Sequence, residues 1–301
     1  MPFLSVIIAA HNCEATLDAT LQSLLNAMDG AENVEVIILN DASTDSTQQI
    51  IEQWRPRFTN FNSEQVAFRN VGQVRRHAIS LASGQYITML DSDDLLKPRS
   101  LRDAIGFLRE QRPDMLLTHL IEIRDLSKIT PEWSGFAPEQ LGTQEAIRRF
   151  LVHKDFQAHL IGQFIHRDIY QKAPIPAMVC YEDFAVFPTL LVESRKICFQ
   201  RSGHYYYVKR PASLSNALDS TKIGHLVECT LSMEQVFPAS FQSLILCHWF
   251  DIYSNHQSRL TDDQRDLVKA RVDRMYSLSF FLAKDVRFSY KKRAIKALWK
   301  K

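Results

Sequence analysis

The sequence has few of the residues that stabilise small secreted domains or bind structural metals. It holds five cysteines in 301 residues, with no C-x-x-C pair and no His/Cys cluster at zinc spacing. The odd number and low density predict reduced thiols in a cytosolic protein. No run approaches ~18 apolar residues, so no membrane-spanning helix is expected. The apolar run at 3–10 has no Lys or Arg before it and no cleavage site after it, so a signal peptide is not expected either.

Strong charge, low complexity and internal repeats are also missing. Hydrophobic residues make up 46% and charged residues 23%, which is an ordinary globular composition and excludes a disordered or fibrous chain. The formal net charge of +2 argues against a strongly basic protein that binds nucleic acid. The length fits one large domain or two ordinary ones.

The near-neutral total hides a basic C-terminal segment. Residues 284–301 contain eight Lys or Arg and one Asp, a net charge of +7, while the rest of the chain carries −5. Phe288, Ile295, Leu298 and Trp299 are interleaved with these cations. The pattern predicts a basic amphipathic helix that lies on an anionic membrane surface. A terminal helix that caps the domain is the alternative, and both interpretations stay open.

The first 120 residues alternate between apolar runs and helical periodicity. Buried strands are expected at 4–9, 34–39, 86–90 and 115–120. Helices are expected between them, with Asn12 capping the first and Asp45 the second. Such alternation predicts an α/β fold, with a mostly parallel sheet covered by helices on both faces. From about residue 221 the pattern is helical.

Polar residues follow three of the predicted strands at the point where each strand ends. These are His11-Asn12, Asn40-Asp41 and the segment 91–94, which reads Asp-Ser-Asp-Asp. In open α/β sheets, ligands bind just past the carboxyl ends of the strands. The three segments therefore predict one binding site along this edge.

The acidic segment 91–94 is the most informative of the three. Carboxylates this close repel one another unless a cation or hydrogen-bond donors compensate. Hard oxygen ligands suit Mg²⁺ or Mn²⁺, which usually also bind substrate phosphates. A metal–diphosphate site at Asp91 and Asp93 is one interpretation. An acidic turn in which Asp93 or Asp94 caps the next helix is the other. Asp41 is placed to accept hydrogen bonds from a base or a ribose.

Together these segments resemble family 2 glycosyltransferases. The resemblance rests on 5–12, 40–47 and 82–94, in the family's order and spacing. It resumes at 180–187, which contains the Glu-Asp pair, and continues weakly through 205–215. The resemblance implies a GT-A fold, a nucleotide-sugar donor and inversion at the anomeric carbon.

The resemblance also implies roles for particular residues. Asp183 matches the position of the general base, and Glu182 would orient it or bind the acceptor. Asp93 would be the direct ligand of a divalent metal, Mn²⁺ or Mg²⁺, with Asp91 facing the ribose or the ion. The donor site would further include Ala10, His11, Asn12, Asp41, Arg75 and Ser92.

Three of the expected contacts rest on side-chain type. Arg75 would add positive charge at the phosphates, with a solvated helix face as its alternative. Tyr205 and Trp133 would contact the acceptor sugar or support the site, although a period-2 strand places part of 205–207 in the core. His159, His166 and His204 are not spaced as a metal set and are expected to be structural or to lie on the acceptor side.

The sequence departs from the family pattern in two places. Arg76 and Ala78 stand where the family often has Asn and Gly, and Gln163 stands near a position that is often Lys. These changes leave the donor sugar open.

The expected organisation has a nucleotide-sugar half at 1–96, an acceptor half at 97–215 and a helical region at 216–301. The expected reaction moves a sugar, most often from a UDP-sugar, to a glycan or lipid-linked glycan in lipopolysaccharide, capsule or exopolysaccharide synthesis. The enzyme is expected to be cytoplasmic, peripheral at the inner face of the plasma membrane, with no nucleic-acid partner.

Two other functions compete with this one. A sugar nucleotidyltransferase would need a Gly-rich basic loop after the first strand, and 10–15 contains no Gly, Lys or Arg. A non-catalytic binding subunit of a glycan-assembly complex would not need Asp91, Asp93 and Asp183.

Overall fold

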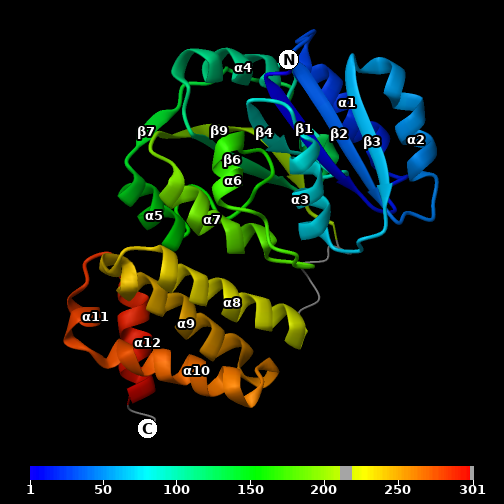
Figure 1. Cartoon of the computed structure of the whole chain (residues 1–301). Coiled ribbons are helices and arrows are strands. Elements are labelled where there is room, and N and C mark those ends of the chain that lie inside the picture. Colours follow the sequence, from blue (N-terminus) through cyan, green and yellow to red (C-terminus); the bar gives the residue numbers. More distant parts are fainter. Residues whose placement is uncertain (211–218, 299–301) are drawn as a thin grey trace.

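A computed structural model of the chain describes residues 1–210 and 219–298 (Figure 1). The weakly matching segment 211–215, the predicted boundary at 215/216 and the last three residues lie outside the described residues. The described strands form one nine-stranded sheet in the order β3-β2-β1-β4-β8-β6-β9-β5, and β7 also pairs with β9. The strands are β1 Leu4–Ala10, β2 Val34–Asp41, β3 Asn60–Val66, β4 Tyr86–Met89, β5 Leu95–Leu96, β6 Met115–Ile123, β7 Glu139–Leu141, β8 Phe164–His166 and β9 Ile197–Val208.

The first half of the sheet is parallel, as the alternating pattern predicts. β1 pairs in parallel with β2 and β4, and β2 pairs in parallel with β3. β1 and β2 are buried along nearly their whole length, which explains their continuous apolar runs. β3 was not predicted, because this edge strand is half-buried and largely polar (NFNSEQV).

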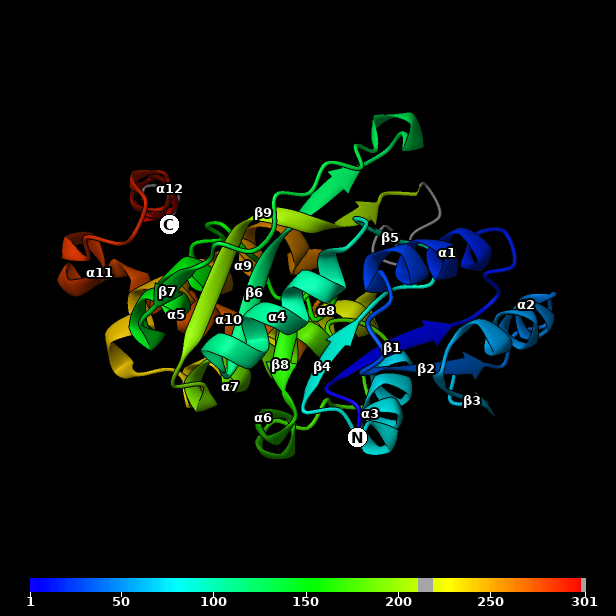
Figure 2. The same cartoon turned by 90° about the horizontal axis from the view of Figure 1, so that it is seen from above.

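The second half of the sheet is mixed. β8 pairs antiparallel with both β4 and β6, and β5 and β7 pair antiparallel with β9. β6 and β9 are parallel, and the end of β6 with the segment that follows it forms the projecting arm in Figure 2. A curled α/β sheet of this kind confirms the predicted fold class and adds antiparallel strands in its second half.

Helices cover both faces of the sheet. α1 packs against α2 and α4, whereas α3 packs on β1 and β2, and α7 packs on α5 and α6. Arg75 of α3 reaches Glu182 of α7, so these two helices share the second face. The helices of this part are α1 Leu17–Met28, α2 Thr47–Trp54, α3 Val71–Leu81, α4 Ser100–Gln111, α5 Thr143–Leu151, α6 Arg167–Lys172 and α7 Glu182–Glu193.

The C-terminal part is helical, as the periodicity after residue 221 predicts. Its helices form a bundle below α5 and α7, with the chain end at the far side (Figure 1). Trp249 is fully buried and donates to Glu234, which also pairs with Arg271. The helices are α8 Ser220–Val236, α9 Gln242–His256, α10 Asp262–Asp273, α11 Leu278–Leu282 and α12 Phe288–Leu298.

Four further expectations concern single features. Asn12 does not cap α1: its Oδ1 accepts from the amide of Thr44 at 2.8 Å, and α1 begins after Thr16. Asp45 does bind the first turn of α2, accepting from the Thr47 amide at 3.0 Å. All five cysteines are free. Among the described helices, none combines the length and the hydropathy needed to cross a bilayer.

Candidate active site

The ends of β1, β2 and β4 meet at one edge of the sheet. Ala10 of β1 is in register with Asn40 of β2, and the Leu90 amide donates to Ile7 of β1 at 2.9 Å. The polar segments that follow these three strands therefore lie side by side, as the sequence predicts. Thr16, which directly precedes α1, and Thr20 of α1 both donate to the Ser92 carbonyl, at 2.9 and 3.1 Å, which fixes the acidic turn from the other side.

Asp41 is buried at this edge, and protein amides already bind its carboxylate. It accepts from the backbone N–H groups of Arg69 at 2.9 Å and Asn70 at 3.2 Å, while His11 Nδ1 contacts the Asp41 carbonyl at 2.6 Å. The carboxylate thus positions the loop between β3 and α3. Direct contact of Asp41 or His11 with a donor remains a prediction.

The turn after β1 lacks the features of a triphosphate-binding loop. The Cys13 amide donates to Thr47 Oγ1 at 2.9 Å, and the Glu14 amide donates to Asp45 at 3.1 Å. Because side chains already use these two N–H groups, they are not available to cradle phosphates. This geometry argues against the nucleotidyltransferase alternative.

Asp94 supports the acidic turn from inside the protein. It is completely buried and accepts from the Tyr205 hydroxyl and the Val208 amide, both at 2.7 Å. Burial, followed by the nearby Asp91, raises the pKa of Asp94 to about 8. The Asp91 amide in turn donates to the Tyr205 hydroxyl at 3.0 Å.

These contacts correct two expectations. Tyr205 is fully buried, so it cannot stack on a sugar, and it acts as a support behind the turn. Neither Asp93 nor Asp94 caps the next helix, because α4 begins at Ser100 and both carboxylates are bound elsewhere.

Asp93 and Asp91 are the more exposed carboxylates of the turn. Asp93 pairs with Arg210 at 3.2 Å, yet burial and the neighbouring Asp91 still raise its pKa. A divalent cation would relieve this repulsion, and carboxylate oxygens are ligands that Mg²⁺ and Mn²⁺ prefer. Among the described residues, no group of three or more His, Cys, Asp or Glu is arranged to hold a metal. The pair therefore fits an ion that water and a diphosphate also coordinate.

Arg75 connects the acidic turn to the start of α7. Its guanidinium pairs with Asp91 at 2.8 Å and with Glu182 at 2.5 Å. Burial acts to lower the pKa of Arg75, but the carboxylates around it outweigh that effect, and the pKa is raised. The alternative of a solvated helix face is therefore wrong for Arg75. Contact between this side chain and donor phosphates stays a prediction, since two carboxylates already bind it.

Glu182 and Asp183 form the first turn of α7 and point in different directions. Glu182 is buried against Arg75, and burial raises its pKa to about 7 while Arg75 opposes the shift. Asp183 is partly exposed, with its Oδ1 accepting from the Phe184 amide at 2.7 Å and its Oδ2 lying 3.6 Å from His159 Nδ1. The helix N-terminus favours the ionised form of carboxylates placed there.

Two residues singled out in the sequence lie in structural positions. The Trp133 indole donates to Asp103 of α4 at 3.0 Å, and its ring packs edge-on against Phe136 at 4.9 Å. Gln163 is buried, with its side chain bound to the backbone of Thr118 and Ile161. These contacts describe support for the β6–β8 region rather than an open binding surface.

Three further residues lie beside the predicted carboxylates, and the sequence pattern assigned none of them a specific role, although it left His159 open as an acceptor-side residue. Arg210 contacts Asp93, His159 faces Asp183, and the Tyr207 ring lies 6.2 Å from the His159 ring. Tyr207 is half-buried, in contrast to Tyr205 two residues earlier. The two tyrosines lie two residues apart in β9 and differ in exposure although both belong to the paired strand.

Comparisons of the sequence identify related proteins. Residues 5–172 match the family described as glycosyl transferase family 2. The poly(ribitol-phosphate) β-N-acetylglucosaminyltransferase TarS of Staphylococcus aureus is 33% identical over 115 residues, 38% of this chain and 20% of TarS. The UDP-Glc:α-D-GlcNAc-diphosphoundecaprenol β-1,3-glucosyltransferase WfaP of Escherichia coli is 33% identical over 117 residues, 37% of this chain and 43% of WfaP. The matched segments thus span less than half of both relatives.

Solved structures share the fold over most of the chain. TarS residues 1–349 with UDP-GlcNAc superpose with a TM-score of 0.70 and 19% identity, covering 88% of this chain and 79% of that one. The mannosyltransferase PcManGT of Pyrobaculum calidifontis, with GDP-Man and Mn²⁺, gives 0.61 and 13%, covering 99% and 80%. The family match covers more than half of the 301 residues and includes every strand end described above. With its curled α/β sheet and the acidic turn after β4, the chain belongs to glycosyl transferase family 2.

Proposed function

We propose that the protein is an inverting glycosyltransferase that moves a sugar from a UDP-sugar to a hydroxyl group of a glycan or lipid-linked glycan. One observation carries the proposal: Arg75 joins Asp91, beside the proposed metal ligand Asp93, to Glu182, beside the proposed base Asp183. A carboxylate pair suited to a metal–diphosphate and an exposed carboxylate suited to proton removal are thereby held together. Both are what transfer from a nucleotide-sugar requires.

Asp93, with Asp91 next to it, would hold the divalent cation. When bound, the cation supplies Lewis-acid stabilisation of the departing diphosphate, which contributes several kcal/mol in such sites. The repulsion that raises the pKa of Asp93 is the feature of these residues that supports this assignment. Arg210, which binds Asp93 here, adds positive charge at the same place.

Asp183 would accept the proton of the attacking hydroxyl. As the acceptor oxygen bonds to the anomeric carbon, the bond from that carbon to the phosphate oxygen breaks, and its electron pair leaves with the diphosphate. The acceptor proton passes to Asp183 Oδ2. General-base catalysis of this kind typically contributes about 10²–10⁴-fold. A single base suffices for inversion.

The names of the related proteins favour UDP as the nucleotide. TarS was solved with UDP-GlcNAc, and the WfaP reaction uses UDP-Glc with a diphosphoundecaprenol-linked acceptor. PcManGT was solved with GDP-Man, so the donor is a matter for direct measurement. The acceptor in the TarS name is poly(ribitol-phosphate), and the acceptor in the WfaP name is a sugar linked to diphosphoundecaprenol, which supports a glycan or lipid-linked glycan as the acceptor class.

The test is release of nucleoside diphosphate from a panel of UDP-, GDP- and dTDP-sugars with Mn²⁺ or Mg²⁺. We expect release with at least one UDP-sugar, its loss on addition of EDTA, and its loss in Asp93→Ala and in Asp183→Asn. Absence of release from every donor, with glycan acceptors present, would overturn the enzymatic function in favour of a binding subunit. Full activity of the two variants would overturn the assigned roles.

A second part of the proposal is attachment of the C-terminal helices to an anionic membrane surface. Among the described residues, four of the nine exposed large hydrophobic side chains lie between residues 278 and 295: Leu278, Leu282, Phe288 and Ile295. Leu278 and Leu282 are one turn apart on α11, and Phe288 and Ile295 are two turns apart on α12. Exposed Lys284, Lys292 and Lys296 surround them, which is the pattern of an interfacial helix.

The opposite face of α12 holds it in the bundle. Ala294 is buried, Arg293 pairs with Asp251 at 3.0 Å, and Tyr290 donates to the same carboxylate. Residues 284–296 of the predicted segment thus pack on the helical region and also expose basic and apolar side chains, so the two interpretations of the sequence are compatible. Substitutions test the surface better than deletion, which would remove these packed residues.

The test is sedimentation with vesicles that contain an anionic or a zwitterionic lipid. Lys292→Glu/Lys296→Glu and Phe288→Ser/Ile295→Ser are expected to reduce binding to the anionic vesicles and to leave donor turnover unchanged. Lys269→Glu on α10, another exposed lysine, is the matched control. Equal binding by all variants would contradict membrane attachment.

A further inference from the structure

A loop that the reaction scheme has not used brings a histidine to the proposed base. His159 Nδ1 lies 3.6 Å from Asp183 Oδ2, and both side chains are partly open to solvent, at 33% and 23% exposure. The other oxygen of Asp183 accepts from the Phe184 amide. His159 is therefore the side chain that stands beside the oxygen left free for chemistry.

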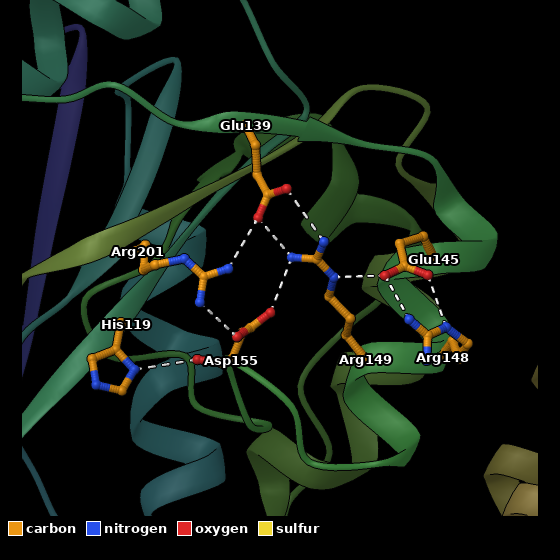
Figure 3. A network of polar contacts seen from close by, with 7 residues as sticks. All are labelled: His119, Glu139, Glu145, Arg148, Arg149, Asp155 and Arg201. Atoms are coloured by element: carbon orange, nitrogen blue, oxygen red, sulfur yellow. Dashed lines mark hydrogen bonds and ion pairs between the residues drawn. The ribbon is translucent and has the colours of Figure 1, made fainter. Parts of the chain in front are cut away.

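The loop that carries His159 is held at one end by an ion network in which the side chains of Asp155 and Arg149 are largely shielded from solvent. Asp155, four residues before His159, pairs with Arg149 at 3.1 Å and with Arg201 at 3.0 Å (Figure 3). His119 Nδ1 contacts the Asp155 carbonyl at 3.2 Å. Asp155 has a φ of 71°, a conformation that non-glycine residues adopt only when their surroundings fix it.

The other end of the loop is joined to the donor side of the site. Ile161 forms a β-bridge with Met89, and the Gly162 amide donates to the Met89 carbonyl at 2.9 Å. Met89 is the last residue of β4, two positions before Asp91. His159 thus stands between two fixed points, with the Tyr207 ring on one side and Asp183 on the other.

From this geometry we infer that His159 is a positioning residue for Asp183, with its Nδ1–H donating to Oδ2 and orienting the carboxylate toward the acceptor hydroxyl. The inference rests on the proposed function, in which Asp183 is the base. Hydrogen bonds of catalytic groups are often long before substrate binds, so 3.6 Å is compatible with closure in the loaded site. A hydrogen bond to a charged group contributes about 1.5 kcal/mol or more, so its loss should lower kcat about tenfold.

The experiment compares His159→Asn, His159→Gln and His159→Ala by the rate of nucleoside diphosphate release with the same donor panel. An Asn amide can occupy the place of Nδ1, whereas the longer Gln places its amide near Nε2. We expect Ala and Gln to lower kcat about tenfold with the donor KM within about twofold, and Asn to retain most of the activity. His166→Asn, which conserves the side-chain acceptor at the start of α6, is the control and should behave as wild type.

Three outcomes overturn the inference. They are wild-type kcat in His159→Ala, equal loss in Asn and Gln, or a loss confined to the donor KM. Thermal unfolding of each variant shows whether the loop still folds, and the two polar variants keep the test valid if His159→Ala does not. If Asp183→Asn is fully active, the proposed function fails first; if Asp183→Asn is inactive and His159→Ala is normal, only the inference fails.

Discussion

Two charged clusters of this protein differ in their balance of charge. The acidic site contains five carboxylates (Asp91, Asp93, Asp94, Glu182, Asp183) and two arginines (Arg75, Arg210). The ion network of Figure 3 contains three carboxylates (Glu139, Glu145, Asp155) and three arginines (Arg148, Arg149, Arg201). Each cluster joins segments that are far apart in the sequence.

The difference in balance corresponds to a difference in use. In the network each carboxylate is paired, and Arg148 and Arg149 hold the pKa of Glu145 down at about 2. In the acidic site, burial and mutual repulsion raise the pKa of Asp93, Asp94 and Glu182. A balanced cluster stabilises the fold, whereas surplus negative charge is tolerated where a cationic ligand is to bind.

The largest expected effect is on catalysis, from the acidic site. Asp183→Asn should lower kcat by about 10²–10⁴-fold, because the amide cannot accept the acceptor proton. Steady-state release of nucleoside diphosphate measures it, and the donor KM and the melting temperature should stay near wild type. Asp168→Asn, an exposed carboxylate on α6, is the control. A loss of less than about threefold would remove Asp183 from the reaction.

Substitutions in the ion network of Figure 3 should change the stability of the protein rather than its catalytic rate. Arg149→Met should lower the free energy of unfolding by about 3 kcal/mol, because Glu139 and Asp155 lose their buried partner and keep the exposed Arg201 as the arginine that they share. Denaturant unfolding measures it. Arg148→Met removes a more exposed pair with Glu145 and should cost under about 1 kcal/mol. Equal effects of the two substitutions would contradict a special role for Arg149.

Because the acidic site carries surplus negative charge, binding of a divalent cation with a nucleotide should stabilise the folded protein. UDP with Mn²⁺ at about 100 times the dissociation constant should stabilise the wild type by about 2.7 kcal/mol, seen as a rise in melting temperature. The part of this rise that EDTA removes should be largely lost in Asp93→Asn. Asp125→Asn, an exposed acidic side chain distant in sequence, should behave as wild type. An unchanged metal-dependent rise in Asp93→Asn would exclude Asp93 as the ligand.

A smaller effect, on the pH dependence of stability, is expected from a histidine that is buried in the core in its neutral form. His204 is fully buried among Phe164, Phe136 and Trp133, and burial lowers its pKa to about 3. Since the unfolded histidine titrates near 6.5, stability from this residue is complete above that pH and falls as the pH decreases toward 3.

His204→Phe should therefore reduce the loss of stability between pH 7 and pH 4. It should also raise stability at pH 7 by about 1 kcal/mol, because neither ring nitrogen has a hydrogen-bond partner among the described protein atoms. Urea unfolding at several pH values measures both. Buried His248, with a pKa lowered to about 4, also makes the free energy of unfolding fall at low pH. The decisive quantity is therefore the difference in the free energy of unfolding between wild type and His204→Phe at each pH. Identical acid sensitivity would contradict the prediction.

Much of the fold could be predicted from the pattern of residues. β1 and β2 are continuous apolar runs because they are buried on both faces, and such runs are visible without a structure. β3 was missed because an edge strand buries little. β5, with two residues, has no detectable period.

The site residues also differ in how far the sequence could predict them. The sequence predicted Asp91, Asp93 and Asp183 as site residues because strand ends and short motifs can be recognised locally. Their resemblance to family 2 glycosyltransferases rests on short runs of consecutive residues. Arg75 was predicted as a site residue, but its partners were not, because Glu182 lies 107 positions away in the chain. His159 was expected only to be structural or to lie on the acceptor side, because no local pattern links it to Asp183.

The sequence by itself therefore determined the chemistry of the acidic turn, the strands that place it at the edge of the sheet, and the basic character of the C-terminal segment. Tertiary structure decided which carboxylates are buried and which face solvent, so that Asp94 supports the turn while Asp93 stays accessible. It also decided the neighbours of Asp183. The physical reason is that burial and charge pairing depend on distance in space, whereas the sequence records only separation along the chain.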